Sequence, residues 1–539
     1  MLITTTGIKQ IDSFHEYKSP KDYYYYYNGL FFLRGKKAGL ESVKELAKTY
    51  ESTNQIDFEK LYGAFSFVIK DPNGKITIFS DNSNMHCVYY SKESLSSSFL
   101  ENINYLTKNQ KVNFNDESLT EFYTLGNVYF GKTLIEEISV SKSSDLFIIE
   151  NNKLIKTDKN INSIEEKSTI NNPIEFLNDV AFALSEEKTC IALTGGYDSR
   201  LLFSGLGDKI DITPTISGNK YDSKDISIAS KIAGILGKKM YVVETPKPEI
   251  NNTLIYHQFK IADGMINFFD DYKVRWNIFR EKLKEDGFKF HISGDGGVLH
   301  KDWEWLQDFP FYNKKRTDIK RYYYHRIAFN YRENNIGGRL KNNLNGQEER
   351  FLKELSKYKK ETNTETYDSL YNYVNGNRKL QYNISAKEFS SYAPLQEIDW
   401  VRYSYDLPRK KRYFNFFIRG MTSKLNKEIA QEVTNWGTTA SNEWSFILRD
   451  YFVEARNYSI KGLRLIGRKV FKKTLFIEKV IDWTIFDEFR ELDIIDQAID
   501  NCIKMEILSP STTKNELTNE QISRVTHIHL LAKYMQNTN

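Results

Sequence analysis

One short segment in the middle of the chain carries the residue types best suited to phosphate chemistry. Two adjacent glycines allow a tight turn and let the backbone approach an oxyanion without side-chain clash. Backbone N–H groups and the start of a following helix would form a positive concavity suited to pyrophosphate, and hydroxyl groups would add donors. The segment consists of Leu193, Thr194, Gly195, Gly196, Tyr197, Asp198, Ser199 and Arg200.

Within this segment, Asp198 is a candidate magnesium ligand rather than a phosphate contact. A carboxylate repels phosphate, but it can bind a Mg²⁺ ion that bridges the phosphates. The segment lacks the lysine of a Walker loop, so it does not imply transfer of a γ-phosphate. A plainer interpretation is a Gly-Gly turn followed by a helix cap at Asp198 and Ser199, with no ligand.

Alternating strands and helices are expected to position this turn. Asn172-Pro173 predicts the start of a helix whose apolar residues recur with helical spacing over 177–184. Later helices are expected between strands, and the chain is expected to be mainly helical from about residue 302. The strands are predicted over residues 189–193, 212–216, 240–243 and 288–292. This alternation predicts a parallel, doubly wound sheet, with the turn at the end of its first strand.

The residues before this region are expected to be mostly β. Apolar runs over 65–69 and 76–79 flank a turn signal at 71–74, and Tyr23 to Tyr27 are interpreted as a half-buried strand or edge segment. Residues 151–170 are polar and form the best candidate for a linker. Because 539 residues are too many for one compact domain, we predict two domains, over residues 1–155 and 170–539.

Several segments together resemble a known superfamily. The glycine turn resembles the PP-loop of the ATP pyrophosphatases, Ser-Gly-Gly-x-Asp-Ser, with Thr194 in place of the first serine. Other segments resemble one PP-loop branch, the asparagine synthetases and their relatives, over roughly residues 58 to 435. These segments are 61–67 with Asp81, 88–90, 126–128, 130–134, 215–218 with Asp225, 291–297, 394–397, 407–408 and Arg419.

The resemblance implies a fold and an activity. The fold is α/β plus α+β: an N-terminal Ntn-hydrolase-like α/β/β/α sandwich and a C-terminal PP-loop synthetase domain with a doubly wound parallel sheet and a mainly helical last part. The activity is ATP-dependent amide formation, in which a small-molecule carboxylate becomes an acyl-adenylate, pyrophosphate leaves, and ammonia or an amine captures the acyl group. ATP and Mg²⁺ are the implied cofactors, and a homodimer is a further expectation.

Individual residues receive roles from the same resemblance. Asp198 and Asp295 are the implied magnesium ligands, and Asp295 with Glu388 would form the acid/base machinery. A solvated helix glutamate is the alternative for Glu388, which precedes Pro394 by two residues more than in the asparagine synthetase pattern. The implied nucleotide contacts are Leu193, Thr194, Gly195, Gly196, Asp198, Ser199, Ile216, Ser217, Asp225 and Gly294.

Two positions depart from the family pattern. Leu2 stands where glutamine-using relatives carry an N-terminal cysteine, so we expect no glutaminase nucleophile. Val298 stands where a second magnesium carboxylate is expected. Either Asp295, Asp302 or a shifted backbone replaces that carboxylate, or metal binding is impaired. In the last case, Val298→Asp should tighten metal-dependent ATP binding.

Composition excludes some classes of protein. A net charge of +5 on 539 residues is too weak to indicate nucleic-acid binding. Three scattered cysteines, Cys87, Cys190 and Cys502, share no metal-ligand spacing and favour a reducing compartment. No apolar run approaches the ~18 residues of a membrane span, and the first residues do not resemble a signal peptide. We therefore expect a cytoplasmic protein without a membrane or nucleic-acid partner.

Three alternatives to this interpretation stay open. The chain could be a pseudoenzyme or scaffold that retains nucleotide binding, which Leu2 and Val298 favour and an intact Asp198 disfavours. It could be a homologue of glutamine-dependent asparagine synthetases that receives ammonia from elsewhere. A PP-loop enzyme that modifies tRNA is the third, but no basic patch with base-stacking aromatic residues near the turn supports it.

Overall fold

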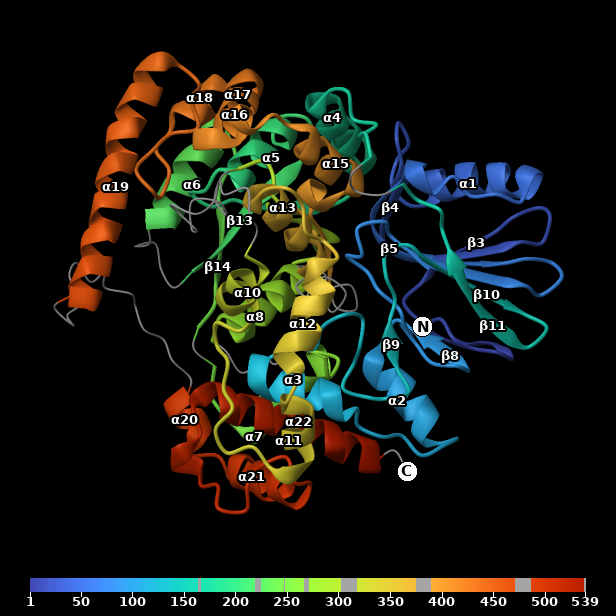
Figure 1. The fold of residues 1–539 in the computed structure, drawn as a ribbon. Coiled ribbons are helices and arrows are strands. Elements are labelled where there is room, and N and C mark those ends of the chain that lie inside the picture. The colour runs from blue at the N-terminus through green and yellow to red at the C-terminus, as the bar shows by residue number, and fades with distance from the viewer. Residues whose placement is uncertain are drawn as a thin grey trace.

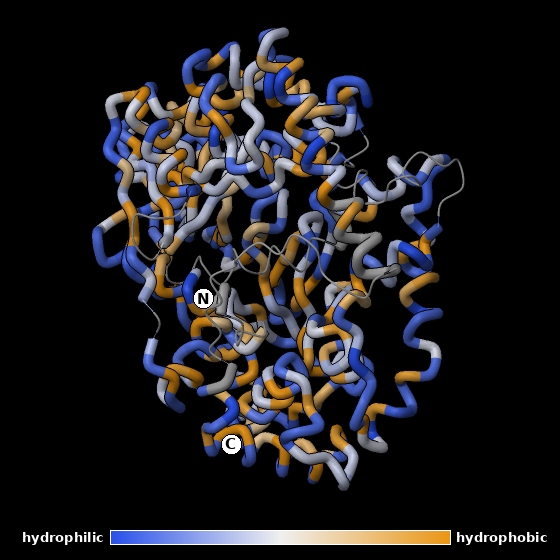
Figure 2. Tube along the Cα trace, turned by 90° about the vertical axis from the view of Figure 1, so that its left-hand side faces the viewer, coloured by the Kyte–Doolittle hydropathy of each residue, from blue (hydrophilic) through white to orange (hydrophobic). Residues whose placement is uncertain are grey.

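Two antiparallel sheets and one parallel sheet organise the chain, as seen in a computed structural model (Figure 1). The structure describes residues 1–162, 166–218, 224–246, 248–265, 271–301, 318–374, 389–470 and 486–537. Apolar segments gather toward the inside of the molecule, and hydrophilic ones dominate its outer turns (Figure 2). Over these described ranges, no helix has both the length and the apolar composition that crossing a membrane requires.

The first part of the chain contains both antiparallel sheets. The six-stranded sheet has the order β11-β10-β6-β5-β4-β3, and the five-stranded sheet has the order β2-β1-β8-β7-β9. The strands are β1 (Leu2–Thr4), β2 (Gly7–Gln10), β3 (His15–Lys18), β4 (Tyr24–Leu33), β5 (Leu61–Lys70), β6 (Ile76–Ser80), β7 (Tyr89–Tyr90), β8 (Ser94–Ser96), β9 (Ser139–Val140), β10 (Asp145–Glu150) and β11 (Lys153–Asp158).

Apolar clusters stack these two sheets and their helices in four layers. Between the sheets, Ile3 and Leu95 share a buried cluster with Val68. Helix α1 (Leu40–Thr53) covers the outer face of the six-stranded sheet, with Leu46 in a cluster that includes residues of β4, β5 and β6. Helices α2 (Phe99–Thr107) and α3 (Asp116–Leu125) share the next cluster with Tyr89 of the five-stranded sheet. The order of layers is therefore helix, sheet, sheet, helices (Figure 1).

The antiparallel part confirms some predictions and corrects two. The predicted strands at 65–69 and 76–79 lie in β5 and β6. Tyr24 to Tyr27 of the tyrosine run lie in β4, which confirms the strand interpretation. Because β4 pairs with both β3 and β5, the alternative of an edge segment is wrong. The linker predicted at 151–170 is wrong for residues 153–158, which form β11. Asn151 and Asn152 have φ of 51° and 58°, the left-handed pair that a two-residue hairpin turn requires.

The third sheet is parallel throughout, as the alternation of strands and helices predicts. Its order is β14-β13-β12-β15-β16. Four of its strands were predicted, whereas β16 lies in a region expected to be helical. That strand has only three residues, Ser-Ser-Tyr, and therefore no apolar run to reveal it. The strands are β12 (Thr189–Ala192), β13 (Ile212–Gly218), β14 (Tyr241–Glu244), β15 (Phe290–Ile292) and β16 (Ser390–Tyr392).

Helices cover both faces of this sheet. On one face, α4 (Pro173–Leu184), α5 (Asp198–Leu206) and α6 (Lys224–Ile235) share a buried cluster with Ile191 of β12. On the other, Phe279 of α8 (Asp271–Glu285) packs in a cluster with Cys190 and Val243. As predicted, Asn172 caps α4: its side chain accepts a hydrogen bond from the backbone N–H of Ile174. The doubly wound arrangement is therefore present.

The remaining described elements are helical. The last two helices return to the first part of the chain, where α22 lies beside α2 and α3 (Figure 1). These elements are α7 (Asn252–Ile261), α10 (Ile319–Tyr322), α11 (Gly338–Leu344), α12 (Gln347–Ser356), α13 (Asn363–Val374), α15 (Ile398–Asp406), α16 (Arg409–Arg412), α17 (Phe416–Leu425), α18 (Lys427–Gln431), α19 (Trp444–Val470), α20 (Phe486–Arg490), α21 (Asp493–Lys504) and α22 (Asn519–Asn537), with short helical turns at 58–60, 323–327, 394–396, 413–415 and 514–516.

Buried carboxylates join the six-stranded sheet to the segment around α15. Glu397 accepts hydrogen bonds from the Gly63 backbone N–H at 2.7 Å and from the Ser83 hydroxyl at 3.4 Å. Tyr62 donates its hydroxyl to Asp399 at 2.7 Å. Burial raises the pKa of Glu397 to about 8, against the lowering effect of the Gly63 N–H. The folded protein therefore retains a proton on Glu397 at pH values where the unfolded chain has lost it.

This carboxyl predicts a pH dependence of stability. Because the folded state binds the extra proton, stability falls as pH rises from about 4.5 to about 8, by at most ~1.4 kcal/mol per pH unit for one group. Glu397→Gln removes that proton-binding group, so its urea-unfolding free energy should fall less than that of the wild type between pH 5 and 8. The exposed Glu349→Gln is the matched control. Equal pH slopes for wild type and Glu397→Gln would contradict the prediction.

Candidate functional site

The predicted glycine turn lies where the strand order of the parallel sheet reverses. From β12 the chain adds β13 and β14 on one side, and later β15 and β16 on the other. The turn after β12 leads into α5, and the loop of residues 293–301 follows β15. Loops at the carboxyl ends of two such strands border the crevice in which open α/β sheets bind their ligands. The topology therefore places both predicted segments at one site.

Side-chain hydroxyl groups stabilise the glycine turn through hydrogen bonds to its own backbone. Ser199 Oγ accepts from the Thr194 backbone N–H at 3.2 Å and lies 3.1 Å from Thr194 Oγ1. Thr194 Oγ1 in turn accepts from the Gly196 N–H at 3.2 Å. The Gly195 N–H donates to Asp225 Oδ1 at 3.2 Å. A Cβ at position 195 would lie 2.7 Å from that oxygen, so the close approach of Asp225 requires glycine.

The second loop presses against the start of α5 with almost no intervening side chain. A Cβ on Gly294 would lie 2.8 Å from the backbone nitrogen of Ser199. A Cβ on Gly297 would collide with the carboxylate of Asp198. Because neither position leaves room for a side chain, the backbone of residues 294–297 forms one wall of the site. The structure thus brings Gly294, Asp198 and Ser199 together, as the resemblance implies.

Asp198 forms an ion pair that the sequence did not indicate. Lys301 Nζ contacts Asp198 Oδ2, and His300 Nε2 lies 3.5 Å from Asp198 Oδ1. Burial alone would favour the neutral acid, but Lys301 and His300 together lower the pKa of Asp198 to about 2. The carboxylate is therefore charged at every physiological pH. His300 and Lys301 lie three and four residues after the predicted segment 291–297, at the end of the same loop, and that proximity is the signal that could have identified them.

Two buried arginines attach the segment 429–441 to the turn. Arg200 donates to the backbone oxygen of Val433 at 3.1 Å and also contacts that of Glu432. The Gly195 carbonyl accepts from the Asn435 N–H at 3.2 Å, and Lys224 Nζ donates to the Asn435 carbonyl at 2.7 Å. Segment 429–441 was not predicted at this site, because most of its contacts with the turn are made through backbone groups.

Arg419 extends this attachment into a buried network. It is fully buried and donates to Asp450 Oδ2 at 2.9 Å and to the Tyr197 hydroxyl at 3.2 Å. Tyr197, the residue immediately before α5, shares a further hydrogen bond with Thr438 Oγ1 at 2.7 Å. Asp450 also accepts from the backbone and hydroxyl of Thr439, at 2.8 and 2.7 Å. Arg419, predicted as part of a family signature, therefore supports the turn from behind.

The remaining predicted site residues are in part buried, in part exposed and in part outside the described residues. Leu193 and Ile216 are buried in the cluster beneath the site, and their side chains serve packing. Ser217 is exposed at the end of β13, and Asp295 is exposed in the second loop, where its backbone N–H donates to Ser293 Oγ at 3.2 Å. Glu388 and Asp302 lie outside the described residues.

Among the residues that the structure describes, the donors at this site do not suit a magnesium ion held by the protein. The carboxylate of Asp198 faces an ammonium group, which takes the place that a cation would need. Across the described ranges, no group of three or more His, Cys, Asp or Glu side chains is arranged to hold a metal ion. The pairing of Asp198 and Asp295 as magnesium ligands stays a prediction without support from this geometry.

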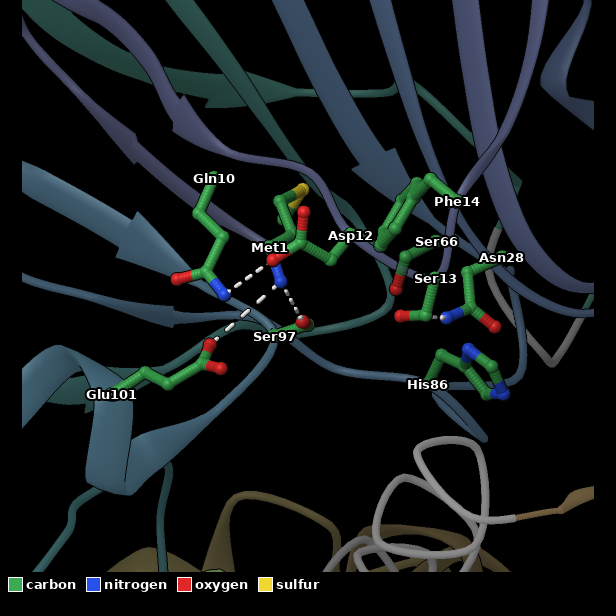
Figure 3. A pocket seen from close by; sticks show the side chains of 10 residues that line it. All are labelled: Met1, Gln10, Asp12, Ser13, Phe14, Asn28, Ser66, His86, Ser97 and Glu101. Atoms are coloured by element: carbon green, nitrogen blue, oxygen red, sulfur yellow. Dashed lines mark hydrogen bonds and ion pairs between the residues drawn. The ribbon is translucent and has the colours of Figure 1, made fainter.

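A separate cavity of about 160 Å³ lies in the N-terminal part of the chain. Met1, Gln10, Ser97 and Glu101 lie on one side of it, and His86 lies with Asn28 and Ser13 on the other (Figure 3). The Met1 amino group donates to Ser97 Oγ at 3.1 Å and lies 3.7 Å from Glu101 Oε2. Cys87 is buried and does not line this cavity. The cavity residues therefore supply no thiol nucleophile.

No protein-family model matches the chain, and no curated protein shows significant similarity to it.

Proposed function

We propose that the chain is an ATP-dependent amide-forming ligase of the asparagine synthetase kind, which releases AMP and pyrophosphate. One observation carries the proposal: the glycine turn and the glycine-walled second loop meet at the reversal of strand order, over the start of α5. The free N–H groups of a helix start and its dipole favour an anion at this point. A nucleoside triphosphate is the ligand that this arrangement suits best.

The proposed chemistry proceeds in two balanced steps. A carboxylate oxygen of the substrate attacks the α-phosphorus of ATP, the bond to the β-phosphate breaks, and pyrophosphate leaves with the bonding electrons. The nitrogen of ammonia or an amine then attacks the acyl carbon, the carbon–oxygen bond to AMP breaks, and the nitrogen loses one proton to solvent. The residues of the turn bind and orient the phosphates, and donors at the helix start stabilise the charge on the departing pyrophosphate. Mg²⁺ enters as part of the substrate, bound to ATP.

Exchange of labelled pyrophosphate into ATP tests this proposal without knowledge of the amine. The protein is incubated with ATP, Mg²⁺, labelled pyrophosphate and a pool of small carboxylic acids. We expect exchange that depends on the carboxylate pool, because adenylation is reversible until the amine arrives. Formation of ADP and phosphate in place of AMP and pyrophosphate would contradict the assignment.

The nitrogen source gives a separate prediction. Since the N-terminal cavity contains no thiol, glutamine should not be hydrolysed, and amide formation should depend on ammonium or a substrate amine. The rate should rise with pH as more of the amine is unprotonated. The measurement is glutamate release from glutamine beside amide formation at several pH values. Glutamate released in proportion to the amide would contradict the prediction, and Cys87→Ala would then identify the thiol responsible.

The proposed function also assigns a role to each part of the chain and a compartment to the protein. We propose that the helix–sheet–sheet–helix part is an Ntn-type domain retained without its nucleophile, that the parallel-sheet part is the synthetase domain, and that the protein works in the reducing cytoplasm. Three buried free cysteines agree with that compartment.

A specific observation favours a second candidate, a nucleotide-binding scaffold without turnover. The pairing of Asp198 with Lys301 is also what an inactivated metal site would retain. ATP binding measured by calorimetry together with the absence of pyrophosphate exchange for every carboxylate offered would favour the scaffold over the ligase.

A further inference from the structure

Lys301 occupies the position at which a metal ion would be expected. We propose that its ammonium group is the resident cation of the nucleotide site and contacts the ATP phosphates in place of a magnesium ion held by the protein. The inference rests on the proposed function insofar as ATP must bind at the glycine turn. It assigns a phosphate-binding role to a residue outside every predicted motif.

The position of Lys301 suits that role. Its side chain is only 15% exposed and ends on the carboxylate of Asp198, the first residue of α5. An ammonium group has three donors, and Asp198 uses one of them. The second loop presses against the same carboxylate at Gly297 and against the helix start at Gly294, and the glycine turn leads directly into that helix start. A phosphate bound at the start of α5 would therefore lie close to the Lys301 ammonium group.

His300 keeps the ion pair aligned. Trp400 donates its indole N–H to His300 Nδ1 at 3.2 Å, and an indole nitrogen can only donate. Nδ1 of His300 therefore accepts, and in the neutral ring the proton lies on Nε2, which faces Asp198 Oδ1. His300 thus adds a donor without a charge of its own, and Lys301 is the counter-ion of the Asp198 carboxylate.

The apolar residue at position 298 agrees with this arrangement. A second carboxylate would repel the phosphates unless a divalent cation neutralised it. With Lys301 already balancing Asp198, the site gains nothing from another negative charge. Val298 is then the residue expected for a site whose permanent cation is an ammonium group rather than a metal.

Two binding measurements test the inference. The first is a Mn²⁺ titration of the nucleotide-free wild type followed by electron paramagnetic resonance, with Asp198→Asn as the comparison. We expect no stoichiometric site below millimolar Mn²⁺, whereas one tight site abolished by Asp198→Asn would overturn the inference. The second is calorimetry of a non-hydrolysable ATP analogue with Mg²⁺. Lys301→Met should weaken binding by roughly ten- to a hundred-fold, the effect of losing one charged hydrogen bond.

Controls separate this result from a folding defect. Lys301→Arg retains the charge and should retain most of the affinity, and Lys289→Met removes another ion-paired lysine, 2.8 Å from Glu187, that lies away from the site. The inference also reverses the expectation for Val298→Asp, which should now leave metal-dependent ATP binding unchanged or weaker. Wild-type affinity in Lys301→Met, or tighter binding in Val298→Asp, would overturn the inference while the ligase proposal stands. If the wild type itself binds no nucleotide, the proposed function fails and the inference fails with it.

Discussion

Asp198→Asn should slow pyrophosphate exchange by ~10²-fold or more, the effect of removing one principal charge-stabilising group from an active site. The amide of asparagine is neutral, so it holds the Lys301 ammonium far more weakly than the Asp198 carboxylate that now contacts this group. Freed from its anchor, Lys301 would lose the orientation that directs it to the phosphates. The same variant should bind the ATP analogue more weakly, because the ammonium group is no longer fixed beside the helix start.

A control with the same chemical change lies just beyond the other end of α5. Asp208 is exposed and lies two residues after the helix ends at Leu206. Asp208→Asn should exchange pyrophosphate at the wild-type rate. Thermal unfolding of both variants shows whether either loses its fold. A folded Asp198→Asn protein with a rate within a few-fold of the wild type would exclude a central role for this carboxylate.

Asp450→Asn should be among the most destabilising single changes in the chain, with a loss of ~3–5 kcal/mol in the free energy of unfolding. The reason is that Arg419 and Asp450 are both fully buried, so the change leaves a guanidinium charge without a counter-ion in the interior. Since Arg419 also donates to Tyr197, which precedes α5, nucleotide affinity should fall with stability. Chemical denaturation and calorimetry measure the two effects.

An exposed ion pair provides the matched control. Asp496 lies 3.1 Å from Lys514 and is 60% exposed, so Asp496→Asn should change stability very little. In a double-mutant cycle, Asp450→Asn combined with Arg419→Gln should cost less than the sum of the single changes, because neither partner then remains charged. Additive losses would show that the pair is not coupled and that the buried network does not depend on its charge.

The elements of the parallel sheet could be predicted because their residues carry local signals. Strand β12 has a short apolar run, α4 has a proline after its asparagine cap, and α5 begins after the paired glycines. Strands β11 and β16 carry no such signal, because β11 is a largely exposed edge strand of mainly polar residues and β16 has three residues. Strand β16 pairs with β15, which lies far earlier in the chain, so that pairing is a property of the tertiary fold. Strand β11 pairs with β10 through the two-residue turn at Asn151 and Asn152.

The candidate site also has parts that could be predicted from the sequence and parts that could not. The glycine turn and the second loop are contiguous motifs, and the sequence predicted both. Lys301 was missed because its meaning depends on the distance from Asp198, across 103 residues of chain. The segment around Asn435 was missed because it binds the turn with backbone atoms, which any residue type supplies. The types of residues along the sequence therefore predict the parts of a site that form local motifs. They do not predict the parts that depend on backbone contacts or on how distant segments meet in the fold.

The cluster shared by α3 and α22 has a consequence for the order in which the protein is made. Leu119 and Phe122 on α3 are buried together with Ile528 and Leu531 on α22, about 400 residues further along the chain. At synthesis rates of ~5–20 residues per second, roughly 20 to 80 s separate the emergence of these helices from the ribosome. During that interval the apolar face of α3 has no partner from α22 and is open to chaperones or to other nascent chains. A chain whose translation stops before α22 would therefore keep the apolar face of α3 exposed to solvent, and that face would promote aggregation.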